Sequence, residues 1–255
     1  AQPLDGIGEL CRRYDVLSYA DVTATLGGMP VRTDQWGIDV ISGGLQKCMG
    51  GPPGSAPITI SDRAADFIMS RRHVEAGIRS SSQTDGSRIR IASNYFDLAM
   101  IMDYWSEKRL NHHTEATSML YAAREAACIV LEEGLENRFA RHCQASTALI
   151  AGLRAMNLEI FGQDAHRMTN VTGLWIPENI NGEAVRTRMR EDFGIEIGTA
   201  FGPLAGRIWR IGTMGYNAVK HKVLLTLGAL EAALAAEGYP VPRGAAVDAA
   251  LACWP

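Results

Sequence analysis

The amino-acid sequence predicts an α/β fold with a mostly parallel sheet, followed by a small α+β domain. In the first half, short apolar runs alternate with amphipathic segments, as strands and helices do around a parallel sheet. Two long helical patterns follow at 115–133 and 135–155, and Gly134 between them is a natural helix stop. The last third reads strand, helix, strand, strand, helix, which is typical of a partly antiparallel sheet. We therefore expect two domains, 1–133 and 134–255.

The first half predicts one helix and then three strands. Apolar side chains recur at helical spacing from Pro3 onward, and the three apolar runs that follow are short and end at polar residues. After the third run, Ser61 and Asp62 suit the N-terminal cap of a helix. A polar, serine-rich stretch then predicts a surface loop. The expected ranges are 3–14 for the first helix, 16–21, 38–42 and 58–61 for the strands, and 79–88 for the loop.

The second half predicts a long helix and a compact α+β unit. Within 135–155, apolar side chains and His142 form one stripe along a helix. The later helices are bounded by turn residues such as Gly194, and the strands are short apolar runs. We expect strands at 171–176, 195–198 and 207–212, and helices at 183–192 and 217–237.

Composition and charge argue against several classes of protein. A formal charge of -3 over 255 residues does not indicate a nucleic-acid partner. The longest apolar run, at 223–236, contains Glu231 and is typical of a helix with one buried face, so we expect no membrane partner. The five cysteines are odd in number and lack zinc-ligand spacing. We therefore expect no metal site, no disulfide framework and a cytoplasmic location.

Lys47 is the most informative single residue. It stands in the stretch GGLQKCMGGPPG, just after a predicted strand, and taken alone it is typical of a lysine that reaches into water. Asp21 ends the preceding strand, and a parallel sheet brings both residues to one rim. Such a lysine can form an imine, and such a carboxylate can keep a pyridine nitrogen protonated, as a pyridoxal phosphate site requires. The two residues could equally form an ion pair on the rim.

Three long stretches resemble one protein family. The first, YADVTATLGGMPVRTDQWGIDVISGGLQKCMGGPPG at 19–54, resembles the cofactor segment of the class V aminotransferases of fold type I. The second, HHTEATSMLYAAREA at 112–126, resembles the helix after the family's HHT signature. The third, GIEIGTAFGPLAGRIWRIGTMGYNA at 194–218, resembles the region that binds the substrate carboxylate. The resemblance implies a pyridoxal-phosphate-dependent aminotransferase, represented here by part of its large cofactor-binding domain and its small C-terminal domain.

The resemblance implies a role for each matching residue of the cofactor site. Lys47 is then the catalytic lysine, which holds pyridoxal 5′-phosphate covalently, and Asp21 is the partner of its pyridine nitrogen. Thr23 packs on the pyridine ring, and Gln46 helps to bind the phosphate. Thr114 reaches the phosphate of the cofactor in the neighbouring subunit, so the resemblance also implies a homodimer with shared active sites.

Arg210 and Asn111 are matched to the substrates. Arg210 is implied to bind the substrate carboxylate, a task that suits its planar, forked guanidinium. Asn111 stands where alanine-glyoxylate enzymes have a tyrosine, and it resembles the branch that transfers an amino group from (S)-ureidoglycine to glyoxylate in purine catabolism. An amide both donates and accepts hydrogen bonds, as a ureido group requires. Alanine or serine as the amino donor, and a simple loop cap at Asn111, stay open as alternatives.

The chains of this family begin well before residue 1 of this sequence. The preceding part normally supplies the first strands of the large domain and a loop that cradles the phosphate at the start of a helix. We therefore expect the sequence to represent a piece of an enzyme that acts on a small-molecule amino donor and glyoxylate. A hypothesis of another class stays open, namely a non-catalytic fragment that lacks half of the cofactor site.

Overall fold

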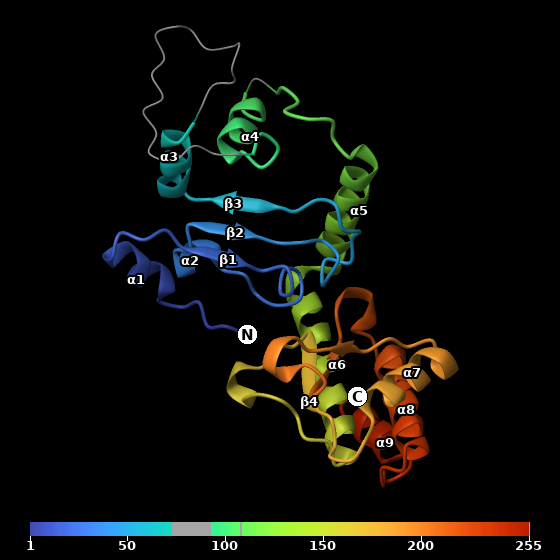
Figure 1. Cartoon of the computed structure of the whole chain (residues 1–255). Helices are drawn as coiled ribbons and strands as arrows, with labels where there is room; N and C mark the ends of the chain where they lie inside the picture. The colour runs from blue at the N-terminus through green and yellow to red at the C-terminus, as the bar shows by residue number, and fades with distance from the viewer. Residues whose placement is uncertain (73–92, 108, 255) are drawn as a thin grey trace, which may run out of the picture.

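The computed structural model describes residues 1–72, 93–107 and 109–254, so the predicted loop at 79–88 lies outside the described residues. Two parts lie one above the other in Figure 1 and are joined where helix α5 leads into helix α6. The first part contains strands β1 to β3 and helices α1 to α5. The second part contains helices α6 to α9 and strands β4 to β6.

The sheet of the first part contains one parallel and one antiparallel pair. Strand β1 (Tyr19–Asp21) runs parallel to β2 (Val40–Ser42), with Asp21 opposite Ser42. Strand β3 (Ile58–Ile60) runs antiparallel to β2, which differs from the expected direction. The reason is that the connection between β2 and β3 contains no helix, whereas a parallel pair needs a crossover. The α/β class is confirmed, and among the described strands of this sheet the parallel direction is confined to β1 and β2.

Helices α1 and α2 pack closely against each other beside the sheet. A side chain on Gly8 of α1 would overlap the carbonyl oxygens of Trp36 and Gly37, so only glycine permits this approach. Helix α1 begins later than expected because Gly6, just before it, adopts a φ of 78° that a helix cannot continue. Helix α2 was absent from the predicted elements. The bounds are Ile7–Arg13 for α1 and Thr33–Trp36 for α2.

A buried carboxylate joins the elements at the end of the sheet away from the rim. Asp39, with 4% of its surface exposed, accepts hydrogen bonds from the Ser18 backbone and side chain, the Ser61 hydroxyl and the Arg63 guanidinium. Burial disfavours its charged form, but the hydrogen bonds from Ser18 and Ser61 and the charge of Arg63 outweigh that cost and lower the pKa of Asp39. These contacts join the starts of β1, β2 and α3.

Of the remaining helices of the first part, α3 and α4 begin at a side chain that accepts a hydrogen bond from the helix backbone, and α5 has no such cap. The Ser61 hydroxyl accepts a hydrogen bond from the Ala64 backbone, which confirms the predicted cap of α3. Asp97 caps α4, a helix that was absent from the predicted elements. Gly134 separates α5 from α6 as expected. The bounds are Asp62–Ser70 for α3, Leu98–Tyr104 for α4 and Thr117–Glu133 for α5.

The second part is a three-stranded antiparallel sheet covered by long helices. Its strand order is β4-β6-β5, and the predicted strands and long helices are present to within a few residues. Helix α9 was absent from the predicted elements. The strands are β4 (Val171–Trp175), β5 (Gly198–Thr199) and β6 (Ile208–Gly212). The helices are α6 (Leu135–Ala155), α7 (Gly182–Phe193), α8 (Lys220–Ala236) and α9 (Ala245–Leu251), with 3-10 turns at Asp164–His166, Gly202–Leu204 and Gly215–Asn217.

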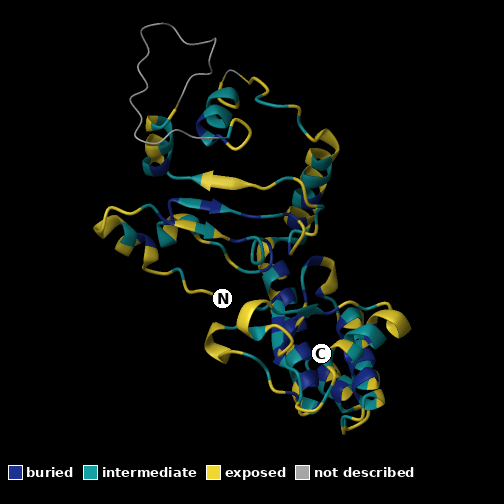
Figure 2. Ribbon diagram, in the orientation of Figure 1, coloured by how far each residue is buried: buried dark blue, intermediate teal, exposed yellow. Residues whose placement is uncertain are grey.

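The two parts have separate hydrophobic cores. In the second part, one cluster joins the facing sides of α6, α7, α8 and α9 to the sheet and includes the fully buried Leu149, Trp209 and Leu230. In the first part, the buried cluster consists of Val22, Ile38 and Ile41. Figure 2 shows the same contrast, with buried residues gathered in the second part and strand β3 largely exposed.

Candidate active site

Asp21 and Lys47 lie at one rim of the first sheet, as the sequence predicts. Asp21 ends β1, and Lys47 follows in the turn after the parallel strand β2. The Asp21 carboxylate is exposed and accepts a hydrogen bond of 2.8 Å from the Thr23 backbone. Hydrogen bonds from the Thr23 side chain and backbone lower the pKa of Asp21. The rim therefore carries an ionised carboxylate and an exposed primary amine at the carboxyl ends of β1 and β2.

Thr23 and Gln46 lie beside each other on this rim. The Gly44 backbone donates a hydrogen bond of 2.9 Å to the Thr23 hydroxyl, which joins the turn after β1 to the turn after β2. A Cβ on Gly44 would overlap the Gln46 side chain and lie 2.9 Å from the Thr23 methyl group. The Gln46 side chain thus covers Gly44 next to Thr23. The structure brings Asp21, Thr23, Gln46 and Lys47 together in two adjacent turns.

The turn that carries Lys47 has two exposed side chains between two buried ones. Leu45 and Cys48 are buried, whereas Gln46 and Lys47 between them are exposed. The Gly50 backbone donates a hydrogen bond of 3.0 Å to the Lys47 carbonyl and closes the turn, with a φ of 76° at Gly50. The buried residues anchor the turn, and they leave the Lys47 ammonium free to reach a ligand above the rim.

Two residues of the second part lie against this turn, one through its side chain and one through its backbone. The Arg138 guanidinium donates a hydrogen bond of 2.6 Å to the Cys48 carbonyl, and a Cβ on Gly215 would lie 3.1 Å from the Lys47 carbonyl oxygen. Sequence reasoning missed Arg138 and Gly215. The one available signal was His142 in the apolar stripe of α6, because a histidine there needs polar partners, and Arg138 lies one turn away.

Arg210 lies on β6 between two glycines. Gly173 of β4 and Gly198 of β5 are its partners in the sheet, so no neighbouring side chain crowds it. Its Nε donates a hydrogen bond of 2.7 Å to the Thr199 carbonyl, and its guanidinium lies 5.4 Å from the centre of the Phe201 ring. Arg210 also lines a pocket of about 280 Å³ with Phe161, Arg167 and Met168. Strand β6 leads directly into the segment that contacts the Lys47 turn.

Within this chain, Thr114 and Asn111 lie away from the rim. Both are exposed in the segment that connects α4 to α5. Within the described residues, no hydrogen bond joins either side chain to Asp21 or Lys47. Between them, His112 and His113 face each other, with 3.1 Å between their Nδ1 atoms. Across the described ranges, no group of three or more His, Cys, Asp or Glu side chains is arranged to hold a metal ion.

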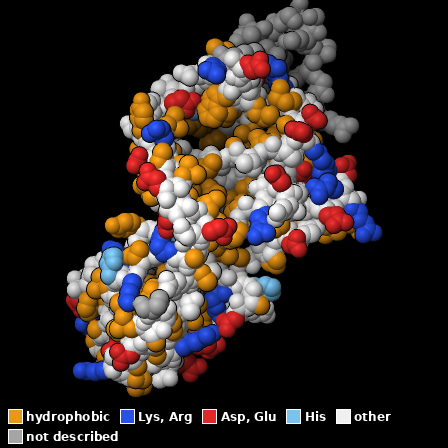
Figure 3. Space-filling model, turned by 180° about the vertical axis from the view of Figure 1, so that it is seen from behind, with side chains coloured by type: hydrophobic (Ala, Val, Ile, Leu, Met, Phe, Trp, Pro, Cys, Tyr) orange, Lys and Arg blue, Asp and Glu red, His pale blue; other side chains and the backbone are white. Residues whose placement is uncertain are grey.

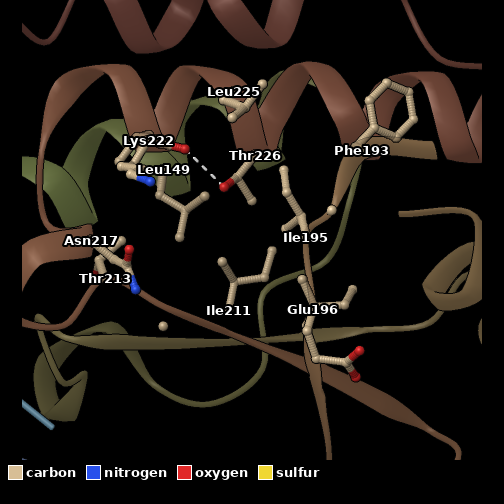
Figure 4. A pocket seen from close by; sticks show the side chains of 14 residues that line it. Leu149, Phe193, Ile195, Glu196, Ile211, Thr213, Asn217, Lys222, Leu225 and Thr226 are labelled. Carbon is tan, nitrogen blue, oxygen red and sulfur yellow. Dashed lines mark hydrogen bonds between the residues drawn. The ribbon is translucent and has the colours of Figure 1, made fainter. Parts of the chain in front are cut away.

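A second pocket lies between α6, α8 and the antiparallel sheet (Figure 4). It has a volume of about 270 Å³, and none of the predicted site residues lines it. Leu149, Ile195 and Ile211 form its apolar interior, and Thr213 and Asn217 lie at one side.

None of the described helices is both long and apolar enough to cross a membrane.

The chemistry of the rim fits pyridoxal phosphate. The ionised Asp21 carboxylate can accept a hydrogen bond from a protonated ring nitrogen, and the exposed Lys47 amine can bond to an aldehyde. The Thr23 and Gln46 side chains lie next to both. Gly43 and Gly44 leave the space between the turns to neighbouring side chains, because a Cβ would overlap Leu26 at Gly43 and Gln46 at Gly44. These residues form one side of a cofactor site.

Comparison with known proteins identifies the family. The family model described as aminotransferase class-V matches residues 1–209. The chain is 52% identical to the (S)-ureidoglycine-glyoxylate transaminase of Bacillus subtilis, over 98% of this chain and 60% of that protein. It is 37% identical to the alanine-glyoxylate aminotransferase of Callithrix jacchus, over 91% of this chain and 53% of that protein.

A solved structure agrees with the sequence relatives. The crystal structure of ureidoglycine-glyoxylate aminotransferase from Bacillus subtilis superimposes with a TM-score of 0.90 and 50% identity, over 99% of this chain and 61% of that one. The chain thus spans about three fifths of the length of this relative. Proteins of this family use pyridoxal phosphate. With 209 of its 255 residues matched by the family model, the chain belongs to the class V aminotransferases.

Proposed function

We propose that the protein containing this chain is a pyridoxal-phosphate-dependent transaminase that moves an amino group from (S)-ureidoglycine to glyoxylate, giving oxalurate and glycine. The observation that carries the reaction type is the placement of Asp21 and Lys47 at the ends of the parallel strands β1 and β2. The 52% identity to the Bacillus subtilis transaminase supports the choice of substrates.

Each rim residue has one proposed task. When bound, pyridoxal phosphate supplies an electron-withdrawing ring that makes the α-proton of an amino acid acidic. Asp21 holds a proton on the ring nitrogen through its depressed pKa. Lys47 would hold the cofactor through its aldehyde group, and its free amine would accept the α-proton of the donor and return it as a general acid. Thr23 would pack on the ring and Gln46 would help to bind the phosphate, whereas Thr114, away from the rim, would reach the phosphate of the cofactor in the neighbouring subunit.

Arg210 and Asn111 are proposed to select the substrates. The exposed Arg210 guanidinium pairs with the carboxylate that both substrates carry. Asn111 is proposed to hydrogen-bond the ureido group with its amide. Alanine-glyoxylate aminotransferases are also relatives, at 37% identity, so alanine and serine are the competing donors. A competition assay with the three donors measures the preference, and an unchanged donor ratio in Asn111→Tyr would remove the proposed role of Asn111.

Several wider features are proposed on the same basis. The exposed apolar side chains of α5, Leu120, Tyr121 and Leu131, support a homodimer in which a second copy covers this helix and Thr114 serves the partner's site. In Figure 3 hydrophobic side chains also border a hollow in the upper half of the view.

The separate cores support two domains divided at Gly134, 1–133 and 134–255. Five free cysteines support a cytoplasmic location.

The absorbance of the lysine-bound cofactor tests the reaction type. Full-length protein mixed with pyridoxal phosphate should develop a new band near the edge of the visible range, and Lys47→Ala should abolish the band and the transamination. Arg154→Ala, an exposed change on α6, should leave both intact. If Lys47→Ala keeps the band, or if the parent protein never forms one, then the chain belongs to a non-catalytic member of the family.

A further inference from the structure

Three segments that carry or follow the proposed site residues meet beside the first turns of α6. They are the turn after Asp21 and Thr23, the turn at Lys47, and the segment between β6 and α8. The buried side chains that join them belong to Arg138 and His142 of α6 and to Asn170, just before β4. We call these three residues the junction cluster.

Arg138 joins the two turns of the rim directly. Its Nε donates a hydrogen bond of 3.0 Å to the Gly27 carbonyl, in the turn that follows Thr23. Its Nη2 donates one of 2.6 Å to the carbonyl of Cys48, the residue directly after Lys47. Its Nη1 pairs with the Glu133 carboxylate at the end of α5. One guanidinium therefore bridges the turn beyond Asp21, the turn of Lys47 and the helix that precedes α6.

Of the other two members of the junction cluster, Asn170 holds the same turns to the second part, and His142 joins α6 to the segment between β6 and α8. Asn170 donates to the Ala24 carbonyl and lies 3.3 Å from the Cys48 sulfur. His142 donates from Nδ1 to the Arg138 carbonyl, because a carbonyl can only accept, and its Nε2 accepts from the Gly215 backbone at 2.9 Å. The Lys47 peptide is thus enclosed between Arg138 and Gly215.

The hydrogen bonds of the Arg138 guanidinium have a geometry that stability alone does not require. A buried guanidinium has a large desolvation cost, and an apolar side chain of the same size often stabilises a fold equally well. Arg138 has only 4% of its surface exposed. Its fork nevertheless reaches two backbone carbonyls in different turns, which a lysine with its single ammonium cannot do in this geometry.

We propose that Arg138 is a positioning residue for Lys47, fixing the turn of the lysine relative to the turn that follows Asp21. The proposal rests on the proposed transaminase function, since it assigns Arg138 the task of holding the amine in register with the carboxylate. Arg138 acts through the Cys48 carbonyl and touches no substrate. A small displacement of a reacting group lowers the reaction rate by a large factor. Accurate placement of the Lys47 amine is therefore a functional reason to bury the charge of Arg138.

Amide hydrogen exchange tests the tie without any need for activity. In full-length protein, Arg138→Lys and Arg138→Met remove the fork, and Met keeps the volume without an unpaired buried charge. The Gly50 and Gly51 amides, which bond to the Lys47 and Leu45 carbonyls, should exchange at least about tenfold faster, while the amides of β6 keep their rates. Arg154→Lys, on the same helix but exposed, should change neither. Unchanged rates at Gly50 and Gly51, or equal acceleration throughout the protein, would overturn the proposal.

Steady-state kinetics then test whether the tie serves the reaction. Arg138→Lys should lower kcat by about tenfold or more and change KM much less, because the lost contact positions the amine and does not bind substrate. An unchanged kcat in a variant with faster local exchange would overturn the positioning role. If the parent protein shows no transamination, the proposed function fails, and the exchange measurement still decides whether Arg138 holds the turn.

Discussion

The two parts of the molecule are held together by different kinds of contact. The second part buries a continuous apolar cluster between four helices and a sheet, whereas the buried apolar cluster of the first part consists of Val22, Ile38 and Ile41. The first part instead depends on polar contacts, at Asp39 on one end of its sheet and at Arg138 beneath the rim. The contrast teaches that the second part acts as a rigid support, from which side chains hold the turns of the proposed site.

Truncation of the larger core should produce the largest loss of stability. Leu230→Ala removes a fully buried side chain of α8 and should lower the free energy of unfolding by about 4 kcal/mol. Ile41→Ala, in the small cluster beside β1, should lower it by about 2 kcal/mol, because fewer neighbours enclose the cavity. Urea unfolding of the full-length protein measures both values. Equal losses would contradict the difference between the two cores.

Removal of the buried carboxylate should destabilise the first part next most strongly. Asp39→Ala leaves the Ser18 and Ser61 groups without their shared acceptor and should cost about 2 kcal/mol in the free energy of unfolding. Asp66→Ala, at an exposed position on α3, is the matched control and should cost less than about 0.5 kcal/mol.

The same carboxylate predicts a dependence on acid. The pKa of Asp39 is lowered from its ordinary 3.8, so its stabilising contribution is present above that pH and is lost as the pH falls through the lowered pKa. Circular dichroism in an acid titration should show the first part losing structure at lower pH in the parent than in Asp39→Ala. Coincident acid transitions in the two proteins would contradict the role of Asp39.

His142 should give a smaller effect near neutral pH. Burial lowers the pKa of His142 below its ordinary 6.5, with further lowering by the charges of Arg141 and Arg138 and a partial offset by Glu133 and the Arg138 carbonyl. The folded protein therefore keeps the ring neutral while the unfolded chain takes up a proton. The contribution is fully present above about pH 6.5 and is lost as the pH falls toward the lowered pKa.

Two variants test this pH dependence. Urea unfolding between pH 7.5 and pH 5.5 should show a fall in stability that His142→Gln removes. His221→Gln, at an exposed position on α8, should leave the fall as it is in the parent. A fall that persists in His142→Gln would show that another group is responsible.

An ion pair on the second part should have the smallest effect. Arg188 of α7 pairs with Glu237 after α8 at 3.2 Å, and both side chains are partly exposed. Arg188→Ala should lower the free energy of unfolding by less than about 1 kcal/mol, since solvent screens such pairs and the large core beneath determines stability. Unfolding at low and high salt measures this. A loss as large as that of Asp39→Ala would mean that polar contacts matter equally in both parts.

Local patterns allowed the long elements and the shared rim of Asp21 and Lys47 to be predicted. The predicted range 135–155 matches α6. Gly134 ends α5, and an uninterrupted apolar stripe begins directly after it. Asp21 and Lys47 were expected on one rim because Asp21 ends one strand and Lys47 follows the next, and the structure places them there. Both inferences need only neighbouring residues and the rules of sheet geometry.

Long-range packing explains what the sequence did not reveal. Asn170 contacts Ala24 across 146 positions, and no local pattern marks such a pair. Arg138 is a charged residue in an amphipathic helix, where a solvated position is the ordinary expectation, yet it lies beneath the rim. The direction of β3 depended on whether a crossover helix fits between 42 and 58, and the glycine-proline turn there excludes one.

The most direct test of the account locates the cofactor on the chain. The sequence contains lysines at positions 47, 108, 220 and 222, so a peptide map can distinguish them all. Full-length protein is incubated with pyridoxal phosphate, reduced with borohydride to make the attachment permanent, and digested for mass spectrometry. The account predicts that the added mass lies on the peptide of Lys47, and that Asp21→Ala lowers its yield. A label distributed over the other lysines, with Lys47 unmodified, would contradict the account.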